Sequence, residues 1–311
     1  LLKDAINPNL VQTMEGTPAF IHGGPFANIA HGTNSIIATR LALSLADYVV
    51  TETGFASDLG AEKFFDIVVR TGQVPAPAAC VLVSTLRALK YHGGVKINEL
   101  PNENPKAVEA GFDNLRKHIE NLKIFGVPFV VALNLFPADH QSEIELWTEL
   151  IKEEKARYAL SNVYNQGGEG GLELAAEVMK AMAEDKANFQ FLYPADQPLL
   201  KKVEAIALKI YGADGVRVET AARKKIELYE QLGLSNLPVC VAKTQASLSD
   251  DSKKIGRPRG WNLTLTNASL SSGAGFVVVH CGDIMTMPGL PKAPAAEKID
   301  VDETGKITGM I

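Results

Sequence analysis

Residues 18–34 read Pro18-Ala-Phe-Ile-His-Gly-Gly-Pro-Phe-Ala-Asn-Ile-Ala-His-Gly-Thr-Asn34, and this stretch decides how we interpret the rest of the chain. A short apolar run, Ala19–Ile21, precedes a glycine turn, and the apolar spacing predicts a helix from Asn28 onward. A strand, a glycine turn and a helix in this order aim backbone N–H groups at an anion. The two glycines, Gly23 and Gly24, let a ligand approach the backbone closely.

Polar side chains crowd this turn: His22, Asn28, His31 and Asn34. Their imidazole and amide groups can bind an anion or transfer a proton, because histidine titrates near neutral pH. The same residues also fit a tight turn in which side chains only cap backbone groups. The sequence leaves both interpretations open.

The composition narrows the class of protein. The chain has 311 residues, 46% of them hydrophobic, and a formal net charge of -5. We find no basic stripe for a nucleic acid, no apolar run long enough to span a membrane, and no signal peptide. Cys80, Cys240 and Cys281 are isolated, so we expect free thiols and a reducing cytoplasm, and no zinc site.

Short apolar runs alternate with helical patterns over residues 1–160. This alternation predicts a parallel sheet with right-handed crossovers. The clearest helix lies between Pro105 and Gly126, and another is expected to start at Ser142, where Glu145 completes a capping box. The expected strands are Ala19–Ile21, Tyr48–Thr51, Ala79–Val83, Phe129–Leu133 and Ala159–Val163.

The character of the chain changes after residue 190. Prolines near Tyr193 and Gln197 indicate a linker, and the pattern beyond them predicts a smaller α+β domain. We therefore divide the chain into domains 1–190 and 191–311. The expected elements of the second are helices Leu199–Ile210 and Ala221–Leu232 and strands Pro238–Ala242, Trp261–Thr266 and Gly275–His280.

Ligands of parallel sheets bind at the carboxyl ends of the strands, so the loops there are candidate sites. Glu52 and Asp58 follow the second expected strand, and such carboxylates can hold a hydrated Mg²⁺ or belong to a solvated loop. Asn134 and Asp139 follow the fourth, and they can read a purine edge or form an Asx turn.

Two further loops have ambiguous patterns. Gly167–Gly171 is glycine-rich but has neither the G-x-x-x-x-G-K-[ST] nor the G-x-G-x-x-G spacing. We interpret it as a lid or a wall of a binding cleft. The polar loop Lys243–Asp251 comes directly after an expected strand, where it can bind an anion or simply turn.

Taken together, the motifs resemble a known family. The stretches that carry the resemblance are His22–Gly32, Gly54–Ile67, Lys243–Asp251 and Gly282–Pro291. They are similar to formate–tetrahydrofolate ligase and occur in order over nearly the whole chain. The resemblance implies that formate, ATP and tetrahydrofolate give 10-formyltetrahydrofolate, ADP and phosphate. It also implies Mg²⁺, a monovalent cation (K⁺ or NH₄⁺), and a homotetramer in the cytoplasm.

The sequence departs from the family pattern in one major respect. The ATP phosphate loop of the family, G-x-x-x-x-G-K-[ST], is absent, and the chain begins with Leu1 rather than Met. We therefore expect the C-terminal portion of such a ligase: an α/β fold, with the parallel sheet of a P-loop-type nucleotide-binding domain lacking its N-terminal strands. We expect this fragment to be inactive alone.

Smaller departures concern the binding residues. The family usually has a basic residue where Leu135 stands and often Thr where His140 stands. Gln197 occupies the place of a tryptophan that stacks on the pterin in some members, and Ala246 that of a common aromatic residue. The pterin then stacks on another aromatic side chain, for which the candidates are Tyr193, Tyr164 and Phe191.

The resemblance implies a role for each candidate residue. His22, Asn28 and His31, with the Gly23 and Gly24 amides, are the expected catalytic groups beside formyl phosphate. The metal ligands are Glu52 and Asp58. The residues expected to bind nucleotide or folate are Gly23, Gly24, Thr53, Gly54, Asn134, Asp139, Tyr164, Gly168, Gly170 and Tyr193.

Two other classes remain open. One is a non-catalytic folate- or nucleotide-binding remnant, or a subunit completed by a separate N-terminal chain. The other is a dinucleotide-dependent dehydrogenase, which the absence of G-x-G-x-x-G after a strand disfavours.

Overall fold

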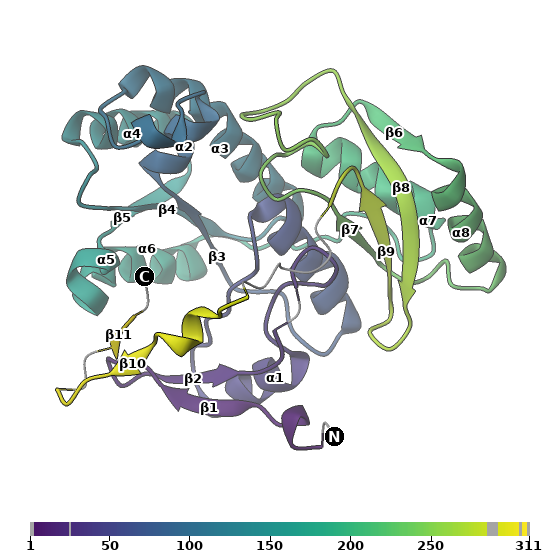
Figure 1. Ribbon diagram of the computed structural model, residues 1–311, viewed down its shortest axis with the longest axis horizontal. Helices are drawn as coiled ribbons and strands as arrows, with labels where there is room; N and C mark the ends of the chain where they lie inside the picture. The colour runs from purple at the N-terminus through teal and green to yellow at the C-terminus, as the bar shows by residue number, and fades with distance from the viewer. Residues whose placement is uncertain (1–2, 25, 285–291, 305–306, 310–311) are drawn as a thin grey trace.

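The computed structural model describes residues 3–24, 26–284, 292–304 and 307–309. A three-stranded sheet with helices on both faces lies beside a four-stranded sheet, and an N-terminal hairpin lies below the first sheet (Figure 1). Pro25 and the part of the Gly282–Pro291 motif from residue 285 onward lie outside the described residues.

The first sheet is parallel, as the sequence predicts. Its strands are β3 (Cys80–Ser84), β4 (Phe129–Asn134) and β5 (Arg157–Ser161), in that order, with Val131 opposite both Leu82 and Tyr158. The fifth expected strand therefore ends earlier than predicted. The middle strand β4 is almost wholly buried, whereas the edge strand β3 leaves Val83 61% exposed. Parallel strands are normally covered on both faces, and only the middle strand here meets that expectation.

The helices that connect these strands follow the apolar spacing of the sequence. Helix α3 (Pro105–Phe125) is capped by the Asn104 side chain and ends at Gly126, which is left-handed at φ 68°. Helix α4 (Gln141–Glu153) corrects one prediction, because it begins after His140 and the Ser142 hydroxyl does not cap it. That hydroxyl instead donates a hydrogen bond to Glu103.

Helices cover both faces of this sheet. Helix α6 (Leu172–Glu184) packs against β4 and β5, while α2 (Leu86–His92), α3 and α4 lie on the other face (Figure 1).

The N-terminal region differs most from the sequence prediction. Strand β2 (Pro18–Ile21) contains the expected Ala19–Ile21, but it pairs antiparallel with β1 (Asn9–Gln12) in a hairpin and does not join the parallel sheet. Residues 48–51 form no strand. The helix expected from Asn28 begins later, as α1 (Ile36–Leu45), where Ser35 supplies the N-cap.

The second sheet is mixed, in the order β6-β8-β9-β7. Strands β8 and β9 are antiparallel neighbours, and the two outer strands are parallel to their partners. Strand β6 was not predicted, because its four residues contain glycine and arginine in place of an apolar run. The elements are α7 (Leu199–Ala205), η7 (Ile206–Tyr211), β6 (Gly215–Val218), α8 (Thr220–Gln231), β7 (Val239–Ala242), β8 (Asn262–Ser271) and β9 (Phe276–Cys281).

The remaining elements are short. Two of them, η2 and η3, are π-helices, which occur most often at functional sites. The bounds are η1 (Asp4–Ile6), η2 (Ser57–Ala61), η3 (Phe64–Val68), η4 (Val69–Thr71), η5 (Ile97–Glu99), α5 (Val163–Gln166), η6 (Gly167–Gly171), η8 (Ala295–Glu297), β10 (Asp300–Val301) and β11 (Ile307–Thr308).

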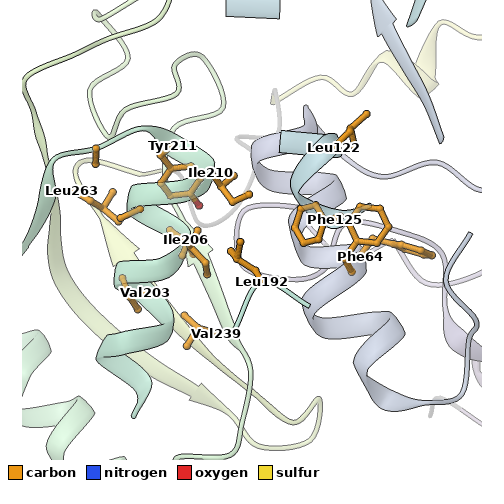
Figure 2. Packing of buried hydrophobic residues seen from close by; sticks show 14 of the residues in the cluster. Phe64, Leu122, Phe125, Leu192, Val203, Ile206, Ile210, Tyr211, Val239 and Leu263 are labelled. Atoms are coloured by element: carbon orange, nitrogen blue, oxygen red, sulfur yellow. The ribbon is translucent and has the colours of Figure 1, made fainter. Parts of the chain in front are cut away.

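One cluster of buried apolar residues includes members from both sides of residue 190. Phe64 and Phe125 come from the first part of the chain, and Leu192, Ile206 and Val239 come from the second (Figure 2). Burying this apolar surface stabilises the contact between the two parts. The boundary near residue 190 remains a prediction.

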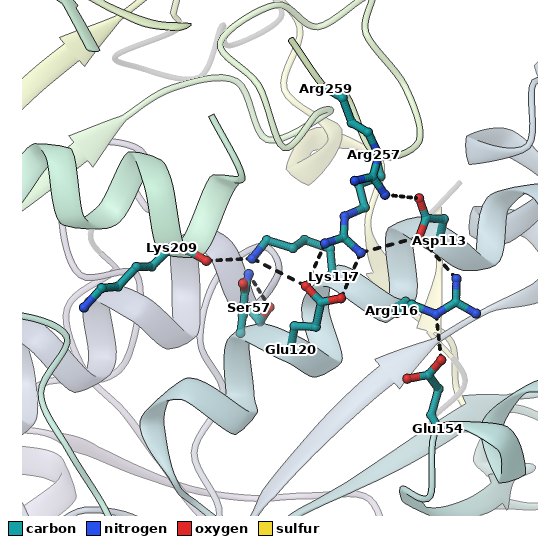
Figure 3. Close-up of polar contacts among 10 residues, drawn as sticks. Ser57, Asp113, Arg116, Lys117, Glu120, Glu154, Lys209, Arg257 and Arg259 are labelled. Atoms are coloured by element: carbon teal, nitrogen blue, oxygen red, sulfur yellow. Dashed lines mark hydrogen bonds and ion pairs between the residues drawn. The ribbon is translucent and has the colours of Figure 1, made fainter. Parts of the chain in front are cut away.

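Polar contacts also join helix α3 to the second part of the chain. Arg257 donates two hydrogen bonds to Glu120, at 2.9 and 2.7 Å, and Lys117 Nζ donates to the Lys209 carbonyl at 2.6 Å (Figure 3). None of the helices described is long and apolar enough to cross a membrane. The cysteines are free, as predicted, and burial raises the pKa of Cys80 to about 12.

Candidate active site

His22 is tied to the scaffold through both ring nitrogens. Its Nε2 donates to the Ala5 carbonyl at 2.9 Å, and its Nδ1 lies 2.6 Å from Ser35 Oγ. The Ser35 hydroxyl also caps α1 by accepting from the Ala38 N–H at 3.0 Å. With Nε2 donating, the neutral ring accepts the Ser35 proton at Nδ1. These contacts favour a structural role for His22.

His31 has fewer contacts and a perturbed environment. Its Nδ1 accepts a long hydrogen bond from the Thr33 N–H at 3.4 Å, which requires an unprotonated Nδ1. Burial first, and the nearby charge of Lys63 second, lower the pKa of His31 below its ordinary value of 6.5. The neutral ring then carries its hydrogen on Nε2, where it can donate to a ligand.

The glycines of the turn provide backbone conformations that other residues rarely adopt. Gly23 has φ 73° and Gly24 has φ 142°. A Cβ atom built on Gly24 meets no described atom within 4 Å, so conformation and not crowding explains this glycine.

The segment around Gly54 lies against the turn, although neither follows a strand of the parallel sheet as predicted. The Gly54 N–H donates to the Gly32 carbonyl at 2.6 Å, and the Thr33 hydroxyl donates to the Glu52 carbonyl at 2.7 Å. Thr33 and Thr53 form an isolated antiparallel bridge. The turn and the segment around Gly54 are therefore in direct contact.

Lys63 and Cys240 support the turn from its buried side, and the sequence interpretation assigned a role to neither. The Lys63 Nζ donates to the carbonyls of Ala27 at 2.6 Å and Asn28 at 3.2 Å. The Cys240 thiol, from β7, donates to the Ala30 carbonyl at 3.6 Å. The turn is thus attached both to the π-helical segment and to the second sheet.

Asp58 forms a buried ion pair instead of an open metal site. Its Oδ2 lies 2.8 Å from Lys243 Nζ, and both side chains are almost fully buried. Burial alone raises the pKa of Asp58, but the charges of Lys243 and His118 and the hydrogen bond from Lys243 outweigh it, so the net pKa lies below its usual value.

This pairing bears on the predicted magnesium ligands. The Lys243 ammonium pairs with the Asp58 carboxylate that a metal ion would need as its ligand. Glu52, in contrast, is exposed. The described residues contain no group of three or more His, Cys, Asp and Glu side chains placed to hold a metal ion. Asp58 therefore does not fit a metal ligand, and Glu52 remains a candidate.

A second pair of carboxyl groups lies beneath the same segment. The Glu62 carboxylate is fully buried and has no hydrogen-bond partner among the described residues. Burial, followed by the charge of Asp66, raises its pKa well above 4.5. Burial also raises the pKa of Asp66 to about 6, although Arg70 binds this carboxylate at 2.6 Å.

Tyr193 belongs to this buried group. Its hydroxyl accepts from the Val239 N–H at 3.3 Å, and Arg70 lies 4.7 Å from its ring centroid. Only 2% of the residue is exposed. This environment favours a packing role over stacking on a pterin.

The loops after β4 and β5 form a second, more open region. Asp139 Oδ2 accepts from the Phe136 N–H at 2.8 Å, three residues earlier in the chain, and burial raises the pKa of Asp139. Tyr164 packs its ring against Phe136 at 5.2 Å and is 65% exposed. Asn134 stands at the end of β4.

The N-terminal hairpin links the two regions. The Gly168 N–H donates to the Glu15 carboxylate at 2.7 Å, and Glu15 lies in the turn between β1 and β2. The hairpin then leads directly into the His22 turn (Figure 1). The Gly170 carbonyl accepts from the Asn162 N–H at 2.9 Å, which closes the glycine loop on the end of β5.

A comparison with protein families identifies the chain. The family model described as formate–tetrahydrofolate ligase matches residues 1–311. The chain belongs to this family. The formate–tetrahydrofolate ligase family joins formate to tetrahydrofolate, which places the chain in one-carbon metabolism. The resemblance stated from the motifs is therefore confirmed.

Sequence interpretation of this ligase missed Lys63, Lys243 and His118. Lys63 directly precedes Phe64-Phe65, and Lys243 directly follows the apolar strand β7. A lysine adjacent to a buried apolar run is a weak signal of a buried ammonium. His118 lies within α3, where only the packing against η2 brings its Nδ1 to 2.8 Å from Ser57 Oγ.

Proposed function

We propose that this chain provides the formyl-transfer site of an ATP-dependent ligase that makes 10-formyltetrahydrofolate through formyl phosphate. A formate oxygen attacks the γ-phosphorus of ATP, and ADP leaves. N10 of tetrahydrofolate then attacks the formyl carbon, phosphate leaves, and N10 loses a proton. The observation that carries the proposal is the His31 ring at the glycine turn of a chain in this family, where burial and the charge of Lys63 lower its pKa.

The turn can act on the second step. Attack on formyl phosphate creates a tetrahedral oxyanion, which is stabilised by donors positioned in advance. His31 Nε2–H, the Gly23 and Gly24 amides and the Asn28 side chain are the proposed donors. Since the His31 ring is neutral, it donates a hydrogen bond without adding a charge that would have to be desolvated.

The open region after β4 and β5 is the proposed binding surface for nucleotide and folate. Asn134 and Asp139 would face the purine edge, although the hydrogen bond from the Phe136 N–H to Asp139 Oδ2 leaves one oxygen, Oδ1, for this contact. Tyr164 and Phe191 are the exposed aromatic candidates for the pterin, and Tyr164 is the more exposed. The Gly168 and Gly170 backbone, and Thr53 and Gly54 beside the turn, complete the proposed contacts.

Ions and assembly belong to the same proposal. Mg²⁺ commonly takes one or two protein carboxylates together with substrate phosphates, which Glu52 fits and Asp58 does not. When bound, it would neutralise phosphate charge. A K⁺ or NH₄⁺ ion, a homotetramer and a cytoplasmic location are proposed from the family resemblance.

The experiment measures 10-formyltetrahydrofolate formed from formate, ATP and tetrahydrofolate. We expect no turnover by the chain alone, because its sequence contains no G-x-x-x-x-G-K-[ST] loop to bind the β- and γ-phosphates. Co-expression with a separate polypeptide that carries this loop should restore turnover. Turnover by the chain alone would reject our placement of the phosphate site. Tetrahydrofolate binding without restored turnover would favour a non-catalytic binding subunit.

A further inference from the structure

Lys63 is a buried cation whose bonds lead to the candidate catalytic turn. The residue lies between η2 and η3 and is fully buried. A buried ammonium must find hydrogen-bond acceptors, because its desolvation is otherwise very costly. The acceptors here are the main-chain carbonyls of Ala27, at 2.6 Å, and Asn28, at 3.2 Å. Both carbonyls belong to the turn that ends at His31.

Other contacts restrain the turn without supplying charge. The Cys240 thiol donates to the Ala30 carbonyl at 3.6 Å, and the Gly54 N–H donates to the Gly32 carbonyl. Lys63 therefore holds the middle of the turn, while these neighbours hold its end. Loss of the Lys63 ammonium would leave two carbonyls without their charged donor.

The titratable groups beside the turn that contains His31 come from three segments. Lys63 and Glu62 lie between the π-helices, Cys240 lies on β7, and Glu52 lies beside Thr33. Burial raises the pKa of both Glu62 and Cys240, which favours their neutral forms. Glu52 is exposed, so solvent screens its charge. The Lys63 ammonium is thus the neighbouring charge that acts against protonation of His31.

We propose that Lys63 is a positioning residue of the formyl-transfer site, whose ammonium fixes the Ala27 and Asn28 carbonyls and thereby the orientation of His31 and the glycine amides. The inference rests on the proposed function of the turn. The Lys63 ammonium holds these two main-chain carbonyls and needs no contact with the substrate. It supports catalysis by holding donors in place before the substrate arrives.

The chain contains a matched control for this residue. Lys202, on α7, is also fully buried, and its Nζ donates to the carbonyls of Ala195, Ser235 and Leu237 at 2.7, 2.5 and 2.9 Å. Replacing it removes the same kind of buried ammonium from the second part of the chain. Lys202→Met therefore reports the general destabilisation that Lys63→Met also causes.

The test uses the 311-residue chain and needs no turnover. Nuclear magnetic resonance gives the pKa of His31, and hydrogen exchange gives the protection of the amides in residues 22–34. In Lys63→Met we expect the pKa of His31 to rise towards 6.5 and these amides to exchange about 10- to 100-fold faster. Lys202→Met should change neither. Equal behaviour of the two variants would overturn the proposal.

Additional measurements cover the possibility that Lys63→Met does not fold. Lys63→Gln keeps an amide donor but no charge, so the pKa of His31 should also rise in it. In the wild-type chain the measured pKa of His31 must lie below 6.5, and an ordinary value would overturn the proposal.

The failure of the proposed function would appear in a different experiment. Unchanged turnover of a His31→Ala variant in a full-length family member would reject the catalytic role of the turn. The Lys63 variants would still show whether Lys63 restrains the turn, through the pKa of His31 and the rate of amide exchange.

Discussion

The two candidate regions of this ligase are constructed in opposite ways. The His22–Asn34 turn is supported from its buried side, and its carbonyls accept from Lys63, Cys240 and Gly54. The loops after β4 and β5 are held mainly by local bonds, such as the hydrogen bond from the Phe136 N–H to Asp139, and they leave Tyr164 largely exposed.

This difference corresponds to two different tasks. Donors that stabilise a transition state must be fixed before the reaction, because reorganising them during it costs free energy. Loops that admit and release a substrate must open, and they are drawn from the less stable parts of a structure. We therefore assign chemistry to the turn and binding to the open loops.

The largest expected effect concerns the buried ion pair beneath the turn region. Lys243→Met leaves Asp58 as an unpaired buried carboxylate, so we expect a loss of about 3–5 kcal/mol in the free energy of unfolding. Denaturant unfolding measures it. The control is Lys201→Met, which breaks the exposed pair with Glu204 and should cost no more than about 1 kcal/mol. Similar losses in both variants would contradict the assigned importance of burial.

Alanine substitutions of two glycines, Gly60 and Gly168, compare how tightly the two regions are packed. A Cβ on Gly60 meets the Gly54 carbonyl and lies 2.7 Å from Thr53 Oγ1, and backbone cannot move aside easily. Gly60→Ala should therefore cost about 1–3 kcal/mol. A Cβ on Gly168 meets the flexible end of Glu15 at 2.6 Å, so Gly168→Ala should change stability by less than about 0.5 kcal/mol. Thermal unfolding of both variants gives the comparison, and the reverse order would contradict it.

A smaller effect is expected in the pH dependence of stability. Since the pKa of Glu62 is raised in the folded state, the native protein binds this proton more tightly than the unfolded chain. Glu62 therefore contributes its full stabilisation below pH 4.5, the ordinary pKa of a glutamate. This stabilisation is lost as the pH rises towards the pKa of the folded state, by at most about 1.4 kcal/mol per pH unit. Glu62→Gln should remove that slope.

Other groups titrate in the same range and must be subtracted. Asp66, with a pKa of about 6, also contributes less stability as the pH rises. His92, whose pKa is lowered to about 4 mainly by burial, contributes less stability as the pH falls. Both are present in the wild-type and variant proteins. The difference between the two unfolding curves between pH 5 and 7 therefore reports Glu62 together with its interaction with Asp66. Parallel curves would show that Glu62 is ionised normally.

Much of the first sheet could be predicted from the sequence because its signals are local. The apolar runs gave β3 and β4, and α3 could be recognised from its apolar spacing between Pro105 and Gly126. Proline at the start and glycine after the end constrain the backbone directly. The short strand β6 lacks such a signal, because its pairing with β8 decides its conformation.

The errors came where long-range contacts decide the structure. Ala19–Ile21 is a strand, but a hairpin partner determined its direction. Ser142 had the spacing of a cap, but Glu103 accepts its hydroxyl instead. The ion pair of Asp58 likewise depends on a long-range contact, since Lys243 lies 185 positions away in the sequence.

The central claim is that the His31 turn performs the formyl transfer, and the most direct test is His31→Ala in a full-length ligase of this family with the same turn sequence. Loss of one preorganised donor predicts a fall in kcat of about 10²–10³-fold, with the Kd for tetrahydrofolate nearly unchanged. A variant with wild-type kcat, or one whose only defect is weaker tetrahydrofolate binding, would contradict the account.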